Sequence, residues 1–364
     1  MHGNRTGVAN LPLHGGKAPH WLFERMTRLA REISIAIVSE FGPREMLCRL
    51  SDPFWFQALG CVLGFDWHSS GVTTTVCGAL KEGLRGIEGE LGLFVAGGKG
   101  KASRQTPAQI ELNAERISRD PAPLIYASRM SAKVDSCAVQ DGYQLYHHTF
   151  FFTSDGSWAV VQQGMNDNTR YARRYHWLGE RVTDFVCDPH SAICSQVFGK
   201  ALNMVDAESE NARSIVARVA AEERPEKIVS ELHRVRTLDL PSRHLITAGD
   251  ISPQRLEKIF VETYERKPQS FEELISLRGV GPQTVRSLAL ISELVYGVAP
   301  SYEDPARYSF AHGGKDGIPY PVDRSSYDRS TEILARAVLQ AKLGNQEELL
   351  ALKRLHRAFL SGQL

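Results

Sequence analysis

Carboxylates and imidazoles recur through the first half of the chain, in segments that are otherwise rich in apolar residues. These side chains bind divalent cations, and a bound cation can activate water and neutralise a phosphodiester during its cleavage. We therefore predict a catalytic site in this half of the chain. Its candidate residues are Asp66, His68, Asp135, Asp141 and His176.

A divalent metal, Mg²⁺ or Mn²⁺, is the cofactor that such residues suit, and Asp135, Asp141 and His147 are its expected ligands. His147 and His148 are neighbours on a predicted strand, so their side chains should lie on opposite faces and only one can join the carboxylates. The spacing matches no zinc signature such as HExxH. Each histidine taken singly is also explained as a hydrogen-bonded structural residue.

The segment 270–290 contains a second kind of site, one that would bind phosphate through the backbone. A first helix is expected to end just before a turn in which Gly279 and Gly281 bracket Val280, and the glycines allow backbone angles closed to other residues. Pro282 suits the first position of a second helix. The amides of the turn and of that helix would then converge on one phosphate oxygen.

This pattern resembles the helix-hairpin-helix of DNA repair glycosylases, nucleases and ligases, which has the form Leu-x-Gly-Val-Gly-x-x-Thr and begins here at Leu277. The resemblance implies contacts to the DNA backbone, to which two flanking arginines would add charge without reading sequence. The alternative is an ordinary tight turn between packed helices. The expected DNA contacts are Arg278, Gly279, Val280, Gly281, Thr284 and Arg286.

Asp323, which follows Pro321 and Val322, resembles the aspartate that stabilises positive charge on the sugar in glycosylases with such an element. Residues 301–319 lengthen the spacing, however, and Gln283 stands where lyase-active members carry lysine. Asp323 is also explained as the cap of a following helix. No cysteine follows Cys194, so an iron–sulfur cluster of the kind found in some members is not expected.

Two further features could bring positive charge to a polyanion. Gly-Gly-Lys occurs three times, ending at Lys17, Lys99 and Lys315, and adjacent glycines let amides approach an anion. Residues 170–177 interleave arginines with aromatic rings, which suits a single strand of nucleic acid. Glycine turns and a solvated basic loop explain the same features. The candidate contacts in the second segment are Arg173 and Arg174.

The elements that must position these residues divide the chain into two parts. Residues 1–208 mix helix and strand: apolar periodicity predicts a helix over 21–37 and strands over 143–152 and 158–162, and the Asp-Gly pair between the strands predicts a hairpin. Helical periodicity dominates residues 209–364. We therefore predict an α+β domain with a short antiparallel hairpin or sheet, followed by an all-α helix-hairpin-helix domain.

Composition limits the classes of function. The chain has 364 residues with 43 basic and 42 acidic side chains, so DNA binding must come from local basic patches. No phosphate-loop pattern GxxxxGK[ST] and no GxGxxG fingerprint occurs, so no nucleotide cofactor is expected. Six cysteines without a CxxC pair suit reduced thiols, and the absence of a long apolar run argues against a membrane partner. We expect a cytoplasmic protein.

Taken whole, the sequence resembles an uncharacterised prokaryotic family, Domain of Unknown Function 763. The resemblance runs over nearly the full chain. It rests on residues 13–19, 66–71, 134–136, 141–148, 172–177 and 311–317. The family name implies no activity, so function must be argued from the sites.

Three functions remain open. We favour a DNA-processing or repair enzyme whose first domain cleaves phosphodiesters with a metal while the second binds the DNA backbone, with single-stranded DNA as one candidate partner. Base excision through Asp323 would instead release a free base without metal. A non-enzymatic DNA-binding module would show salt-dependent binding and no product.

Overall fold

A five-stranded antiparallel sheet lies at the centre of the structure, a computed structural model that describes residues 18–65, 70–195, 198–235, 251–306, 332, 334–340 and 350–355. In spatial order the strands are β1 (Leu93–Lys99), β3 (Gln144–Thr153), β4 (Trp158–Asn166), β5 (Tyr171–Leu178) and β6 (Ala192–Cys194). The predicted hairpin is confirmed as β3 and β4, which pair in antiparallel register. Its turn is closed by the N–H of Thr153 donating to Ser157 O at 3.0 Å.

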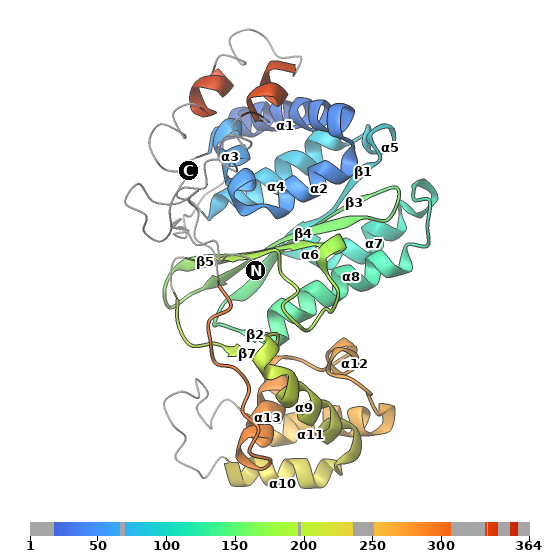
Figure 1. Ribbon diagram of the computed structural model, residues 1–364, viewed down its shortest axis with the longest axis vertical. Helices are drawn as coiled ribbons and strands as arrows, with labels where there is room; N and C mark the ends of the chain where they lie inside the picture. Colours follow the sequence, from blue (N-terminus) through green and yellow to red (C-terminus); the bar gives the residue numbers. More distant parts are fainter. Residues whose placement is uncertain are drawn as a thin grey trace.

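Four helices cover one face of the sheet (Figure 1). They are α1 (His20–Phe41), α2 (Pro43–Ser51), α3 (Pro53–Leu63) and α4 (Gly71–Leu84), and the short α5 (Glu88–Leu91) follows. Helix α1 contains the helix expected over 21–37. Asp52 caps the N-terminus of α3, because its carboxylate accepts hydrogen bonds from the N–H groups of Phe54 at 2.8 Å and Trp55 at 3.2 Å. Every residue of α3 is buried, and most of them belong to the hydrophobic core between these helices and the sheet, which is called the first core below.

The last described segments, 334–340 and 350–355, also join this first core. Leu334 and Leu355 are buried in it, and Arg354 Nη1 donates to Val62 O at 3.1 Å. Figure 1 shows these helical turns beside α1. These two described segments thus pack on the first part of the protein, a contact that the predicted division into 1–208 and 209–364 did not include.

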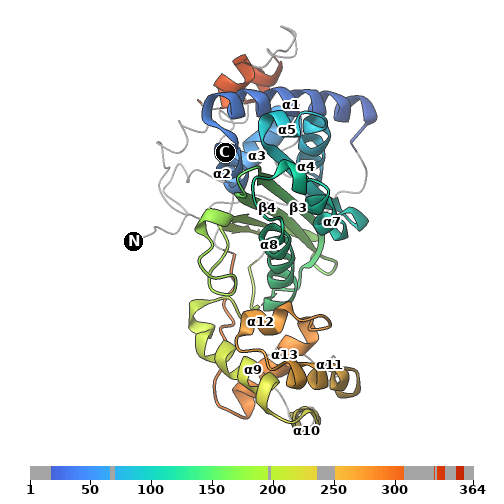
Figure 2. The same ribbon diagram turned by 90° about the vertical axis from the view of Figure 1, so that its right-hand side faces the viewer.

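The opposite face of the sheet is covered by α7 (Thr106–Glu111) and α8 (Ala122–Lys133), with α6 (Lys101–Arg104) and the 3-10 turn η1 (Ala114–Arg116) beside them (Figure 2). Helix α8 continues directly into a π-helical turn, η2 (Val134–Ala138). The chain then forms β2 (Val139–Gln140), which pairs with β7 (Leu202–Asn203) in a separate two-stranded sheet. This connection leads from the central sheet to the helical part.

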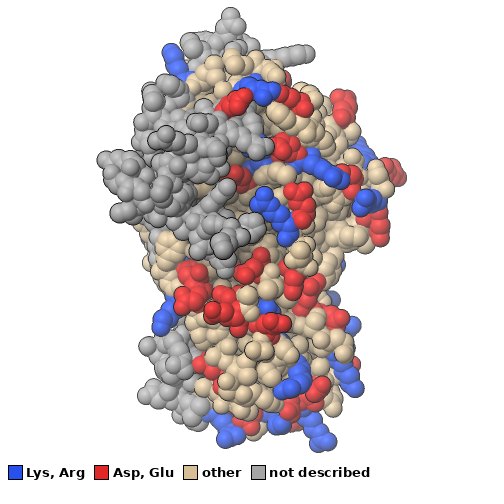
Figure 3. All heavy atoms as spheres, viewed as in Figure 1, with Lys and Arg blue, Asp and Glu red and all other residues tan. Residues whose placement is uncertain are grey.

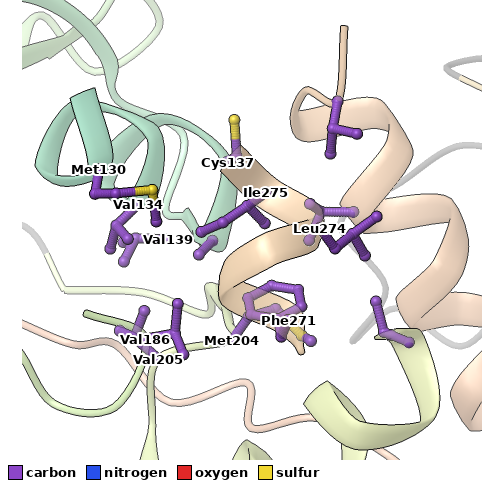
Figure 4. Packing of buried hydrophobic residues seen from close by; sticks show 14 of the residues in the cluster. Met130, Val134, Cys137, Val139, Val186, Met204, Val205, Phe271, Leu274 and Ile275 are labelled. Atoms are coloured by element: carbon purple, nitrogen blue, oxygen red, sulfur yellow. The ribbon is translucent and has the colours of Figure 1, made fainter. Parts of the chain in front are cut away.

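The helical part follows the short turns η3 (Gly179–Arg181) and η4 (Ala207–Ser209). It contains α9 (Glu210–Glu222), α10 (Pro225–Val235), α11 (Pro253–Arg266), α12 (Phe271–Ser276) and α13 (Pro282–Leu294). Its buried apolar residues continue the core on the opposite face of the sheet, and together they form the second core. Figure 4 shows Phe271, Leu274 and Ile275 of α12 among side chains of α8, η2 and β2. The structure therefore mixes helix with an antiparallel sheet, as expected for an α+β fold.

None of the helices within the described ranges combines the length and the apolarity that crossing a bilayer would take.

Candidate functional site

A tight turn joins α12 to α13 and presents backbone amides at the surface. Gly279 takes a φ of +90°, a conformation that L residues rarely adopt, and both Gly279 and Arg278 are exposed. Val280 points the other way, is only 2% exposed and belongs to the second core. Pro282 opens α13. The valine therefore anchors a turn whose flanking residues remain accessible.

The amides of this turn are largely unused. Among the described residues, the N–H groups of Gly279 and Gln283 have no hydrogen-bond acceptor, and that of Gly281 has only Thr284 Oγ1 at 3.5 Å. The N–H groups that open α13 add the positive end of the helix dipole at the same point. This arrangement can receive an anion such as a phosphate oxygen.

The turn is fixed to the rest of the protein through its carbonyl oxygens. Lys133, the last residue of α8, donates from Nζ to Val280 O at 2.5 Å and to Leu277 O at 3.3 Å. Gln140 Nε2 donates to Pro282 O at 2.9 Å, and Gln140 Oε1 accepts from Arg286 Nε at 2.8 Å. Because these bonds to Lys133 and Gln140 use the carbonyl oxygens of the turn, its amides remain available to a ligand. Arg286 contributes to this docking and is half-buried, whereas Arg278 is exposed.

Asp135, on η2, is fully buried and accepts hydrogen bonds from three side chains. The donors are His190 Nε2 at 2.5 Å, Gln162 Nε2 at 2.6 Å and Trp177 Nε1 at 3.0 Å. Gln162 Oε1 lies 2.9 Å from His148 Nδ1, so the network continues to β3. Burial lowers the pKa of His148 below its ordinary value, although the hydrogen bond to Gln162 opposes this. The imidazole of His148 is therefore neutral at pH 7.

Asp141 belongs to a different cluster. Its Oδ2 accepts from Arg173 Nη1 at 2.9 Å and from the Tyr175 hydroxyl at 2.8 Å. Arg173 Nη2 also reaches Asp304 Oδ2 at 2.9 Å. Burial raises the pKa of Asp141, while the guanidinium of Arg173 opposes the rise. The ion pair between Arg173 and Asp304 connects β5 to the segment that follows α13.

The arginines predicted to meet a nucleic-acid strand are inside the protein. Arg173 is 1% exposed and Arg174 is 0% exposed, both on β5. Arg174 Nη2 donates to Gln57 Oε1 at 2.9 Å, and its guanidinium lies 4.6 Å from the centre of the Phe56 ring. Burial lowers the pKa of Arg174 to about 10. DNA contact by these two residues does not fit their burial: alternation on a strand buried on both faces explains the mixture of cations and rings.

The remaining histidine candidates are also buried. His147 lies on the other face of β3 from His148, as strand alternation predicts, and its Nε2 lies 2.9 Å from Thr149 Oγ1. Burial lowers the pKa of His147 to about 3. The Nδ1 of His176 lies 2.9 Å from Leu50 O, and burial lowers the pKa of His176 far below its ordinary value. Both side chains have the surroundings of neutral structural histidines.

The predicted metal ligands Asp135, Asp141 and His147 do not share a hydrogen-bond partner. Within the ranges that the structure describes, no group of three or more His, Cys, Asp or Glu side chains is gathered as for a metal ion. Five predicted site residues lie outside those ranges: Lys17, Asp66, His68, Lys315 and Asp323. Lys99, at the end of β1, is exposed, and its Nζ lies 5.7 Å from the centre of the Tyr146 ring.

A cavity of about 980 Å³ lies between α7, α8 and the start of β3. Ser128, His148 and Gln162 line it, and so do Lys133 and Ser276 beside the α12–α13 turn. Neither Ser128 nor Gln162 was predicted from the sequence as a site residue. Serine in a helix and glutamine in a strand carry no motif, and only the packing of α8 on the sheet brings them together.

Comparison with known proteins agrees with the resemblance seen in the sequence. A family model described as Protein of unknown function (DUF763) matches residues 7–322. The chain belongs to this family. No curated protein and no solved structure was found to match it. In this DUF763 chain, the features that bear on function are the turn, the buried network and the cavity.

Proposed function

We propose that the protein binds DNA through the α12–α13 turn, which acts as a helix-hairpin-helix element, and that it acts on phosphate esters of the bound strand. The observation that carries the first part is the exposed turn at Gly279, whose amides are unused while its carbonyls are fixed by Lys133 and Gln140. Turns of this kind hold phosphate without reading the bases.

The charge around the turn supports the same proposal. Arg278 is exposed on it, and Lys133 lies behind it with Nζ bonded to two turn carbonyls. The whole chain carries a formal charge of only +1, so local cations must supply the attraction for a polyanion. Arg278 places such a cation on the turn whose amides are largely unused.

Replacing Arg278 with alanine tests the proposal. Removing one exposed cation beside a bound phosphate should weaken the binding of a fluorescently labelled duplex and of a single strand alike, since the contact reads no base. The slope of log K against log salt concentration should decrease by about 1. Fluorescence anisotropy over a salt series measures both quantities.

Arg266→Ala is the matched control, because Arg266 is an exposed arginine on α11 that is paired with Glu262 at 3.3 Å. DNA affinity should be unchanged in this variant. Equal affinity and equal salt slope for the wild type and Arg278→Ala would contradict the proposal.

The metal-dependent form of phosphodiester cleavage remains a proposal that rests on other residues. Asp135 and Asp141 are held by protein donors in the described part of the chain. Asp66, His68 and Asp323, the remaining candidates for metal-dependent cleavage and for base excision, lie outside the described residues and stay predictions.

A further inference from the structure

Ser128 and His148 form a hydrogen-bonded pair in the wall of the cavity beside the turn. Ser128 Oγ lies 2.9 Å from His148 Nε2, and both residues line the cavity of about 980 Å³. Ser128 stands on α8 and His148 on the face of β3 that α8 covers. A hydroxyl at this distance from an imidazole can lose its proton to that imidazole when it attacks a substrate.

The hydrogen bonds of Gln162 determine which nitrogen of His148 carries the proton. Gln162 Nε2 lies 2.6 Å from Asp135 Oδ2 and 3.2 Å from Ser131 O, which are both acceptors, so the amide nitrogen must face them. Gln162 Oε1 must then accept from His148 Nδ1, 2.9 Å away. The lone pair of His148 Nε2 therefore faces the Ser128 hydroxyl. This is the tautomer that a general base requires.

Through Gln162, the carboxylate of Asp135 can stabilise positive charge on His148. When His148 takes a proton, the imidazolium faces the carbonyl dipole of Gln162, whose amide is in turn held by the buried carboxylate. His190 and Trp177 hold that carboxylate in place from the other side. A buried, fully bonded network of this kind is rigid and keeps the imidazole oriented.

The chemistry of the cavity wall indicates an anionic substrate. Arg104, Arg129 and Lys133 line the cavity, against one carboxylate, Glu111. Apolar and aromatic side chains such as Leu145 and Tyr146 complete the wall and suit a base or a sugar. Lys133 joins the cavity to the α12–α13 turn, because its Nζ is bonded to two carbonyls of that turn.

We propose that Ser128 is the nucleophile and His148 the general base of a metal-independent site that cleaves phosphate esters in this cavity. The substrate class rests on the proposed function. The reactivity of the serine does not depend on it, because the pair and its network are defined by the geometry alone.

The reaction takes place in two steps. Ser128 Oγ attacks phosphorus and gives its proton to His148 Nε2, the bond from phosphorus to the leaving oxygen breaks, and the imidazolium returns the proton to that oxygen. A phosphoryl group remains on Ser128. Water then attacks phosphorus, His148 takes one proton from it, and the bond to Ser128 Oγ breaks as Oγ recovers the proton. The nearby cations stabilise the added negative charge of each transition state.

A biotin-tagged fluorophosphonate tests the nucleophile directly on the full-length protein in the presence of EDTA. The hydroxyl attacks phosphorus and fluoride leaves, so the tag becomes attached to the serine. Mass spectrometry of the tryptic peptides should find the tag on Ser128. Labelling should disappear in Ser128→Ala and slow by a factor of about 100 or more in His148→Asn, since a positioned base contributes at least that much.

Ser136→Ala is the matched control. Ser136 lines the same cavity, but its hydroxyl is bonded to Lys133 O and Cys137 Sγ rather than to an imidazole. Its replacement should leave the labelling of Ser128 unchanged. Circular dichroism confirms that each variant is folded. No tag on Ser128, or an equal labelling rate in His148→Asn, would overturn the assignment of the pair.

A separate measurement tests whether the substrate is a phosphate ester. With bis(p-nitrophenyl) phosphate and EDTA, the protein should release nitrophenolate, and Ser128→Ala should not. Labelling of Ser128 without this release would overturn the phosphate-ester assignment while leaving the nucleophile in place. Neither result depends on DNA binding, so failure here is distinguishable from failure of the Arg278→Ala test.

Discussion

At the scale of single residues, the sequence predicted some of the buried polar side chains of the site but not their hydrogen-bond partners. Asp135 was selected from the sequence as a catalytic candidate, but its partners Gln162, Trp177 and His190 are 27 to 55 positions away and were not. Their meeting depends on the register of β4 and β5 and on the packing of η2. No local pattern encodes that register, so the donors of this carboxylate could not be named from spacing.

His147 gives a prediction about acid stability. Its pKa is about 3 in the folded protein and 6.5 in an unfolded chain. Below pH 6.5, His147 becomes protonated in the unfolded chain but stays neutral in the folded protein. The free energy of unfolding therefore decreases as the pH falls from 6.5 to about 3. His147→Gln should therefore lose less stability than the wild type between pH 7 and pH 5, by about 2 kcal/mol.

Urea unfolding at the two pH values measures this difference. His148 and His176 are also buried with lowered pKa values, so some loss at low pH should remain in the variant. An unchanged pH dependence in His147→Gln would show that its imidazole is accessible to protons in the folded state.

At the scale of helices and strands, sequence patterns predicted the elements that depend on interactions between residues close together in the chain. The helix over 21–37 and the β3–β4 hairpin are present. The packing of 334–340 and 350–355 on α1 was not foreseen, because an amphipathic helix shows that it has a buried face but not which core that face joins. The Gly-Gly-Lys at the end of β1 likewise has a packing role, which its sequence pattern does not reveal.

Gly97 in that tripeptide is required by the close approach of β1 to β3. A Cβ atom there would lie 2.2 Å from His148 O and 2.6 Å from Thr106 Oγ1, and φ is +89°. Gly97→Ala should lower the free energy of unfolding by about 2 to 5 kcal/mol, the sum of backbone strain and overpacking. Gly86→Ala is the control, because Gly86 has a φ of +86° and open space around it.

Urea denaturation of both glycine variants separates the two effects. Gly86→Ala should lose only the strain, about 1 to 2 kcal/mol. Equal losses in the two variants would show that contact with His148 and Thr106 is not what requires glycine at position 97.

At the scale of the whole molecule, the distribution of charge indicates the side from which a polyanion would approach. Figure 3 shows acidic side chains gathered across the narrow region between the sheet and the lower helices on that face. The cavity lies instead between α7, α8 and the start of β3, and the turn follows α12. Figure 2 shows α7, α8 and α12 on the side that is turned by 90° from the face in Figure 3. Arg104, Arg129 and Lys133 line the cavity there. We expect DNA to lie along that side, with its backbone at the turn and one nucleotide reaching the cavity.

Hydrogen–deuterium exchange tests the central claim most directly, because it reports on the amides of the α12–α13 turn themselves. The amides of Gly279 and Gln283 have no acceptor among the described residues, so they should exchange rapidly in the free protein. Saturating duplex DNA should slow exchange in the peptide that spans residues 277–287, and much less so in Arg278→Ala. Unchanged exchange in this peptide while DNA is demonstrably bound would contradict the account.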